Sequence, residues 1–180
     1  MQLRECIAMK RLAWITDLHL NFLQPPAVEV FCRTVKELAA DGVLLSGDIG
    51  EASNVAQYLK LLASHIDCPI YFVLGNHDFY KGSIAGVRNQ VAALCAAVPK
   101  LHYLNNTGIV TLSEMTGLVG HDGWADGRLG DYPNSDVVLN DYYLIEELRW
   151  LDPRERLRNY FKNSAYNALQ LTISCREARP

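Results

Sequence analysis

The heptapeptide GVLLSGD at residues 42–48 is a short apolar run that ends in a glycine and a carboxylate. Similarly, LAWITD at residues 12–17 is an apolar run that ends in a carboxylate, and IYFVLGNHD at residues 70–78 is one that ends in a glycine and polar residues. Short and nearly continuous apolar runs are typical of strands that are buried on both faces of a sheet. The three segments therefore predict three buried strands, ending near Thr16, Ser46 and Leu74, each followed by polar residues.

The segments after these runs have helical spacing, because their apolar residues recur at every third or fourth position. Pro25-Pro26 and Ser53 predict the starts of the first two helices, and a third is expected after Ser83. The alternation of strands and helices predicts an α/β fold around a parallel sheet with right-handed crossovers. The apolar positions are Val28, Phe31, Val35 and Leu38; Val55, Tyr58, Leu59 and Leu62; and Ile84, Val87, Val91 and Leu94.

The pattern changes after Pro99. Residues 102–104, 109–112 and 117–120 predict the short strands of a meander, with turns at Asn105-Asn106 and Ser113-Glu114. A loop rich in glycine and aspartate follows, and then a helix from about Val138 to Trp150. We expect one domain over residues 1–150 and a divergent basic tail over residues 151–180, since residues 149–180 hold seven basic and three acidic residues.

Composition excludes several classes of protein. The chain has 180 residues and a net charge of −3, which argues against nucleic acid as a partner because nucleic-acid-binding domains carry a strongly basic face. The five cysteines are scattered and form no C-x-x-C pair, which argues against a disulfide framework and a zinc finger. Charged residues interrupt the opening stretch, which argues against a signal peptide there. No later run reaches the roughly 18 apolar residues that a membrane span needs. These features predict a cytoplasmic protein without a membrane partner.

The polar residues that follow the three strands are suited to metal binding. Asp17 and His19 project alike from an extended strand end, whereas Asp48 and Asn76 each follow a glycine. Because ligands bind at the carboxyl edge of such a sheet, these four side chains are expected to converge there. Carboxylate, imidazole and amide oxygen together suit Mn, Fe, Zn, Ni or Mg, and a carboxylate can bridge two ions about 4 Å apart.

Each of these motifs is common by itself, since D-x-H occurs by chance and Gly-Asp usually marks a turn. Their repetition at three successive strand ends is what favours a site. Asp17, Asp48 and Asn76 are separated by 31 and 28 residues, each about one strand–helix unit.

In order and kind, D-x-H at residues 17–19, G-D at residues 47–48 and G-N-H-D at residues 75–78 resemble the calcineurin-like metallophosphoesterase superfamily. The segment from Gly123 to Leu148 also looks like a bacterial branch of it. The resemblance implies an α/β/β/α fold, with mixed sheets flanked by helices, that is incomplete at its carboxyl end. It also implies a phosphoric ester hydrolase with two divalent metal ions, acting on a phosphomonoester or a phosphodiester such as a nucleotide.

The resemblance further implies a role for each motif residue. Asp17 and His19 would hold the first metal, Asp48 would bridge the two metals, and Asn76 would hold the second. His77 would contact the phosphate and protonate the leaving oxygen, with Asp78 orienting it.

The chain departs from the family pattern after His77. The family usually has further histidines, one at a strand end and then a G-H-x-H pair, whereas only His102 and His121 follow here. We interpret His121 as a loop polar group, and His65 and His102 as ordinary histidines. With fewer ligands to hold the metals, weak or no hydrolysis of a generic aryl phosphate is expected even with Mn²⁺.

Three hypotheses therefore remain from the sequence. The chain is an active phosphoesterase, or a truncated or frameshifted family member that acts at most as a binding protein, or a nucleotide-binding module without metal. The absence of G-x-G-x-x-G and of G-x-x-x-x-G-K-[ST] weakens the third. The substrate class stays open between phosphomonoester, phosphodiester, nucleotide and phosphoprotein.

Overall fold

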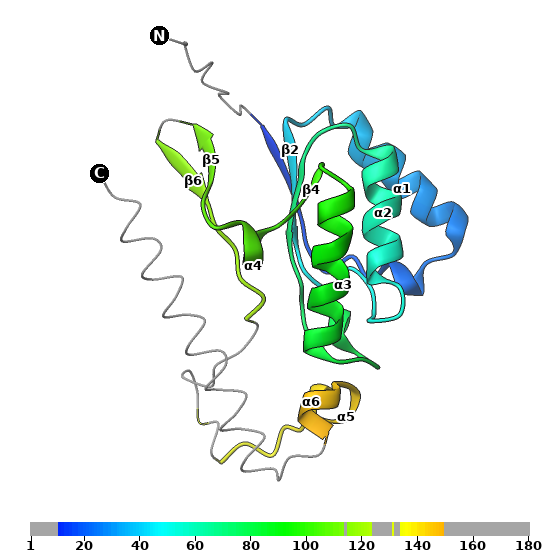
Figure 1. Cartoon of the computed structure of the whole chain (residues 1–180). Helices are drawn as coiled ribbons and strands as arrows, with labels where there is room; N and C mark the ends of the chain where they lie inside the picture. Colours follow the sequence, from blue (N-terminus) through cyan, green and yellow to red (C-terminus); the bar gives the residue numbers. More distant parts are fainter. Residues whose placement is uncertain (1–10, 114, 124–130, 132–133, 150–180) are drawn as a thin grey trace.

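The computed structural model describes residues 11–113, 115–123, 131 and 134–149. Its main sheet has four parallel strands in the order β1-β2-β3-β4 (Figure 1). Their bounds are Leu12–Ile15 for β1, Gly42–Ser46 for β2, Ile70–Val73 for β3 and Leu101–Tyr103 for β4. The three strands expected from the apolar runs are confirmed, and their carboxyl ends lie at one edge of the sheet.

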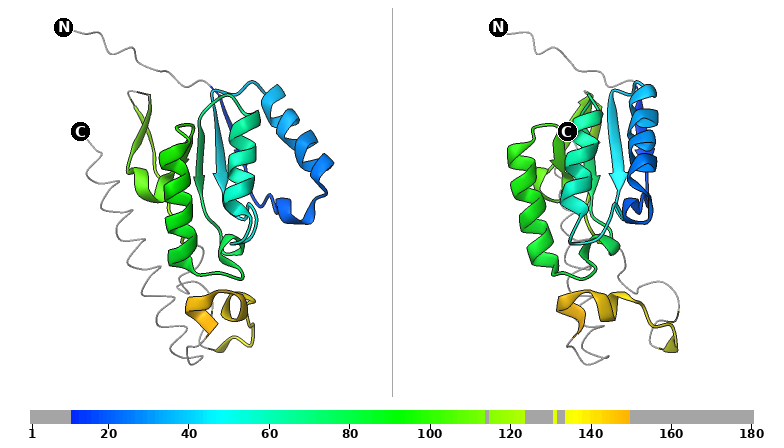
Figure 2. Two further views of the ribbon diagram at one scale, coloured as in Figure 1. Left: turned by 45° about the vertical axis from the view of Figure 1, so that its right-hand side comes forward. Right: turned by 90° about the vertical axis from the view of Figure 1, so that its right-hand side faces the viewer.

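Three helices cover one face of this sheet and form the larger core with it (Figure 2). They are α1 (Pro25–Glu37), α2 (Val55–His65) and α3 (Ile84–Ala97). The expected prolines occupy the first turn of α1, and the Ser83 hydroxyl caps α3 by accepting a hydrogen bond from the Gly86 N–H. The start signal expected at Ser53 for α2 lies one residue early, because Asn54 is the residue that precedes the helix.

A second, two-stranded sheet packs on the opposite face. It is the antiparallel hairpin of β5 (Val110–Ser113) and β6 (Thr116–Leu118), reached through the short helix α4 (Leu104–Thr107). Tyr71, Leu104 and Leu112 are buried between the two sheets. Two packed sheets with helices on the outer face of the first confirm the expected architecture.

The meander predicted after Pro99 is wrong in its first strand. The residues around His102 form β4, which pairs in parallel with β3, because the fourteen-residue helix α3 carries the chain back across the sheet. Asn105-Asn106 lies within α4 rather than in a turn, and the hairpin that follows is as expected.

The helix expected from about Val138 begins only at Asp141 and is interrupted. It forms two single turns, α5 (Asp141–Leu144) and α6 (Glu146–Arg149), on either side of an extended Ile145. Ile145 is fully buried and bridges to Gly82, so burial of this side chain outweighs helical continuity.

The predicted boundary between domain and tail, and Trp150, lie outside the described residues. Within the part of the chain that the structure describes, no helix is both long enough and apolar enough to cross a membrane.

Candidate metal centre

The loops that follow β1 and β2 are joined by backbone hydrogen bonds. The His19 N–H donates to the Asp48 carbonyl at 2.7 Å, and the Leu20 N–H donates to the Ile49 carbonyl at 3.0 Å. Leu20 is fully buried and begins a short 3-10 helix, Leu20–Phe22. The two loops therefore continue side by side beyond the strands, and their polar side chains are held at a fixed separation.

The loops that follow β2 and β3 approach each other through two glycines. A Cβ added to Gly47, which has a φ of +92°, would lie 2.6 Å from the Gly75 nitrogen. A Cβ added to Gly75 would lie 2.7 Å from the Asp48 nitrogen. Only glycine avoids contacts this short, so both glycines are needed to bring Asp48 beside the residues that follow Gly75.

Three of the predicted ligands have strained backbones. Asp17, His19 and Asp48 have φ angles of 53°, 42° and 52°, the left-handed region that non-glycine residues rarely adopt. Such residues cluster at functional sites, where the surrounding structure holds them in place. The strain is therefore an independent sign that this edge of the sheet serves a function.

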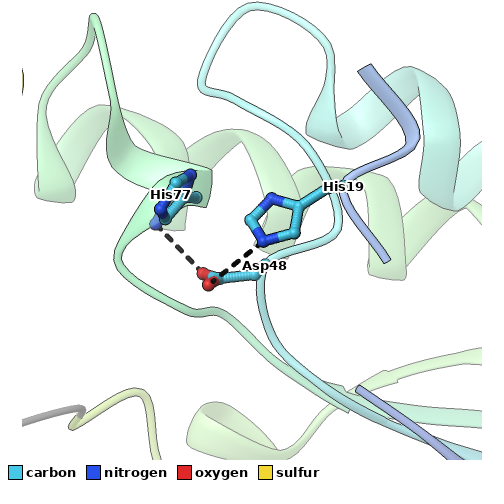
Figure 3. Close-up of side chains that lie close together, drawn as sticks. All are labelled: His19, Asp48 and His77. Carbon is cyan, nitrogen blue, oxygen red and sulfur yellow. Dashed lines mark hydrogen bonds and ion pairs between the residues drawn. The ribbon is translucent and has the colours of Figure 1, made fainter. Parts of the chain in front are cut away.

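His19, Asp48 and His77 converge at the edge of the sheet, as Figure 3 shows. One potential ligand atom of each lies within 4.8 Å of the other two. The His19 Nε2 lies 3.9 Å from Asp48 Oδ2, while Asp48 Oδ1 accepts a hydrogen bond from the His77 N–H at 3.1 Å. The two imidazole rings meet edge to face with their centroids 4.6 Å apart.

The residues of this group fit a divalent cation. Two ligands of one ion, each about 2.1 Å from it, lie about 3–4 Å apart, so a cluster within 4.8 Å closes on an ion with small movements. Imidazole and carboxylate side chains are ligands that suit first-row divalent metals. Among the described residues, the buried His19 Nδ1 has no hydrogen-bond partner. A buried ring nitrogen normally has such a partner, so the His19 ring is not held by hydrogen bonds at this atom.

Of the other two predicted ligands, Asp17 lies outside this group of three, and Asn76 directly precedes His77 in the chain. Asp17 is exposed on the same loop as His19, and its carboxylate accepts a hydrogen bond from the Thr16 hydroxyl. Asn76 precedes the 3-10 helix His77–Phe79, and its amide nitrogen donates to Asp141 at 2.8 Å and to the Tyr80 hydroxyl at 3.2 Å. The ligand roles of both residues stay predictions.

Asp78 is fully buried and bonds to the backbone of two loops. Oδ1 accepts hydrogen bonds from the N–H groups of Ile49 at 2.9 Å and Gly50 at 2.8 Å, and Oδ2 accepts one from Gly75 at 2.9 Å. Its carboxylate thus fastens the loop after β2 to the loop after β3. This geometry supports a structural role, and the predicted orienting of His77 stays a prediction.

Burial raises the pKa of Asp78 to about 7 in the metal-free chain, against an ordinary value of 3.8. The backbone N–H groups oppose this shift, and the negative charge of Asp48 adds to it. Between about pH 4 and pH 7, Asp78 therefore keeps its proton in the folded state, whereas it has already lost the proton in the unfolded state. The stabilisation is complete below about pH 4 and is lost as the pH rises through about 7.

We expect the free energy of unfolding of the metal-free chain to fall by at most about 1.4 kcal/mol per pH unit over this interval on account of Asp78. Urea unfolding in EDTA at several pH values from about 4 to 8 measures the slope. The Asp78→Asn variant has no proton to lose at this position and should give a flatter profile. Equal slopes for the two proteins would show that the pKa of Asp78 is the same in the folded and the unfolded chain.

Sequence reasoning missed two buried aspartates near the site. Asp141 accepts the hydrogen bond from Asn76, although it lies 65 residues later in the chain. Asp122 accepts hydrogen bonds from the Leu74 N–H, from Arg88 Nε at 3.0 Å and from the Tyr103 hydroxyl, so it fixes the end of β3. Both lie within the segment that resembles the bacterial branch, or next to it, and that resemblance was the available signal.

The remaining histidines occupy other places. His121 Nδ1 accepts a hydrogen bond from the Gly123 N–H at 2.8 Å, in keeping with a loop polar group. His102 lies on β4 and stacks on Tyr71, and burial lowers its pKa. His65 ends α2. Among the described histidines, cysteines, aspartates and glutamates, the side chains that lie close enough together to share a metal ion are those of His19, Asp48 and His77.

Comparison with known proteins identifies a family of phosphoesterases. The sequence model of the calcineurin-like phosphoesterase family matches residues 10–168. The chain is 37% identical over 82 residues to a UDP-2,3-diacylglucosamine hydrolase of Stenotrophomonas maltophilia (strain K279a), covering 38% of this chain and 33% of the relative. It is 31% identical over 84 residues to a probable cyclic nucleotide phosphodiesterase of Pseudoalteromonas sp. (strain SM9913), covering 39% and 32%.

A solved structure shares the fold. The phosphopantetheinyl hydrolase of Mycobacterium tuberculosis superposes with a TM-score of 0.60 at 16% identity, covering 95% of this chain and 64% of that protein. At this identity the likeness concerns the fold alone. The matches to the two curated relatives span about a third of their length.

Proposed function

Because the chain belongs to the calcineurin-like phosphoesterase family, we propose that it is a phosphoric ester hydrolase that works through two divalent metal ions held at the sheet edge. The observation that carries this proposal is the convergence of His19, Asp48 and His77 from three successive strand ends. Family members are metal-dependent phosphoester hydrolases, and the side chains in this group are of the types that bind first-row divalent metals.

In the proposed site, Asp48 would help to hold both cations. Its carboxylate is next to His19 on one side and to the loop of Asn76 and His77 on the other. Asp17 and His19 would serve the first position and Asn76 the second. Divalent ions at such a centre supply Lewis acidity toward the phosphoryl oxygens and lower the pKa of water.

His77 is proposed to contact the phosphate and to give a proton to the leaving oxygen. The Tyr80 ring stacks on its imidazole with the centroids 4.3 Å apart, and His19 packs against it from another side. These contacts restrict the ring, which favours transfer of a proton to a fixed point. Asp78 would act on His77 indirectly, by fixing the loop that carries it.

A small phosphate ester or a nucleotide is the proposed substrate. The names of the relatives describe hydrolysis of a UDP-linked sugar, of a cyclic nucleotide and of a phosphopantetheinyl group. A net charge of −3 supplies no basic surface for nucleic acid. A phosphomonoester and a phosphodiester both fit this proposal.

The test combines metal binding with hydrolysis. Calorimetry with Mn²⁺ should show binding to the purified chain, and p-nitrophenyl phosphate and bis(p-nitrophenyl) phosphate should be hydrolysed slowly with Mn²⁺ and not in EDTA. A slow rate is expected because the predicted set offers four protein ligands and fewer ligands hold the ions less firmly. Binding without turnover would favour the alternative of a cation-binding family member, and no binding would refute the metal centre.

A further inference from the structure

The segment of α5 and α6 docks onto the loop that follows His77. The Lys81 N–H donates to the Leu144 carbonyl at 2.7 Å, and the Glu146 N–H donates to the Gly82 carbonyl at 3.0 Å. Tyr142, Ile145 and Leu148 are buried against the main core. This docking brings a distant part of the chain to the site and fixes where its first residue, Asp141, lies.

Glu147 strengthens the same attachment. Its carboxylate accepts hydrogen bonds from the N–H groups of Ile84 at 2.9 Å and Ala85 at 3.1 Å, which lie in the first turn of α3. A carboxylate is favourable at a helix amino terminus because it satisfies N–H groups that have no partner within the helix. The position of Asp141 therefore rests on backbone pairing, apolar burial and a helix cap.

Asp141 is 2% exposed and forms a closed ring of hydrogen bonds with two residues of the site loop. Its Oδ1 accepts one bond from Asn76 Nδ2 at 2.8 Å and one from the Tyr80 hydroxyl at 2.7 Å. Asn76 Nδ2 also donates to the Tyr80 oxygen at 3.2 Å. Both hydrogens of the Asn76 amide are therefore directed to this ring.

This ring determines which way the Asn76 amide faces. A carboxylate only accepts hydrogen bonds, so the NH₂ of the amide has to face Asp141. The amide oxygen, which is the atom of this side chain that can bind a cation, then points away from Asp141. An amide without such a neighbour can turn over and present its NH₂ to the cation, which repels it.

We propose that Asp141 is a positioning residue that holds the Asn76 amide with its oxygen toward the metal centre. The proposal rests on the proposed function, since it assigns Asp141 a role in cation binding through Asn76. Partners of metal ligands that act in this way typically contribute about 10–100-fold to metal affinity.

The experiment is a double-mutant cycle on the full chain, with the Mn²⁺ dissociation constant measured by calorimetry. Asp141→Ala should weaken Mn²⁺ binding about 10–100-fold. Asn76→Ala should weaken it at least as much. The variant with both changes should bind Mn²⁺ no more weakly than Asn76→Ala, because Asp141 has no amide left to orient.

A matched control separates positioning from general stability. Asp122 is also 2% exposed and accepts hydrogen bonds at the end of β3, but it does not bond to Asn76. Asp122→Ala should have the same effect on Mn²⁺ affinity with and without Asn76. If Asp141→Ala unfolds the chain, Asp141→Leu fills a similar volume without an acceptor, and it should weaken binding through the same cycle.

Two results would overturn the inference and leave the proposed function intact. They are an unchanged Mn²⁺ affinity in Asp141→Ala, and a loss that adds fully to that of Asn76→Ala. A wild-type chain that does not bind Mn²⁺ would overturn both proposals, so the two failures are distinguishable.

Discussion

Replacement of Asp48 by asparagine is expected to abolish Mn²⁺ binding while the fold persists. The change removes the negative charge beside His19 and the loop of His77, and within the group of three described side chains Asp48 supplies the carboxylate. The loss of affinity should exceed the roughly 10–100-fold cost of changing a residue that only supports a ligand. Any Mn²⁺-dependent hydrolysis should disappear with it.

The fold should survive because asparagine keeps an oxygen at the Oδ1 position. That oxygen accepts the hydrogen bond from the His77 N–H at 3.1 Å, and the backbone bond from His19 to residue 48 is unaffected. Circular dichroism and urea unfolding in EDTA would check this.

Asp67→Asn provides the matched control, since it makes the same change of charge on an exposed carboxylate paired with Lys36, before β3. It should leave Mn²⁺ binding unchanged. If Asp48→Asn binds Mn²⁺ as tightly as the wild type does, Asp48 is not a ligand of the cation.

The sequence predicted the parts of the fold that repeat with a local period. The apolar runs that became β1, β2 and β3 and the helical spacing between them depend on burial alone, so they could be recognised without knowledge of the tertiary structure. The strand ends were correct to within one residue for the same reason. Gly47 and Gly75 mark the points where the chain leaves the sheet.

The misplaced elements depend on long-range contacts. Ile145 interrupts a helix because it pairs with Gly82, 63 residues earlier, and no local pattern announces that pairing. β4 is parallel because α3 returns the chain to the edge of the sheet beside β3, although its three residues resemble a meander strand by themselves. Local periodicity cannot specify a partner strand.

The site was predictable in part for a similar reason. Residues directly after the strands were identified from their position, and the structure brings His19, Asp48 and His77 together. Asp141 was missed because its role depends on a hydrogen bond to Asn76 that spans 65 residues. Asp78 was expected to act on His77, and the backbone N–H groups it binds have no signature in the sequence.

Gly47→Ala should be among the most damaging single changes to both stability and metal binding. A side chain at a φ of +92° strains the backbone, and the new Cβ would lie 2.6 Å from the Gly75 nitrogen and 2.8 Å from the Gly75 Cα. Backbone strain costs about 1–3 kcal/mol and overpacking a further 1–3 kcal/mol. The free energy of unfolding should therefore fall by about 2–6 kcal/mol, as measured by urea unfolding of the metal-free chain.

The loss should reach the metal centre, because the loop after β3 has to move away from Asp48. Gly108→Ala separates the two causes, since Gly108 also has a positive φ, +65°, and an added Cβ there meets nothing within 4 Å. This control should show the backbone cost alone and bind Mn²⁺ as the wild type does. If the two variants lose equal stability and both bind Mn²⁺ normally, close contact between Gly47 and Gly75 is not what holds Asp48 at the centre.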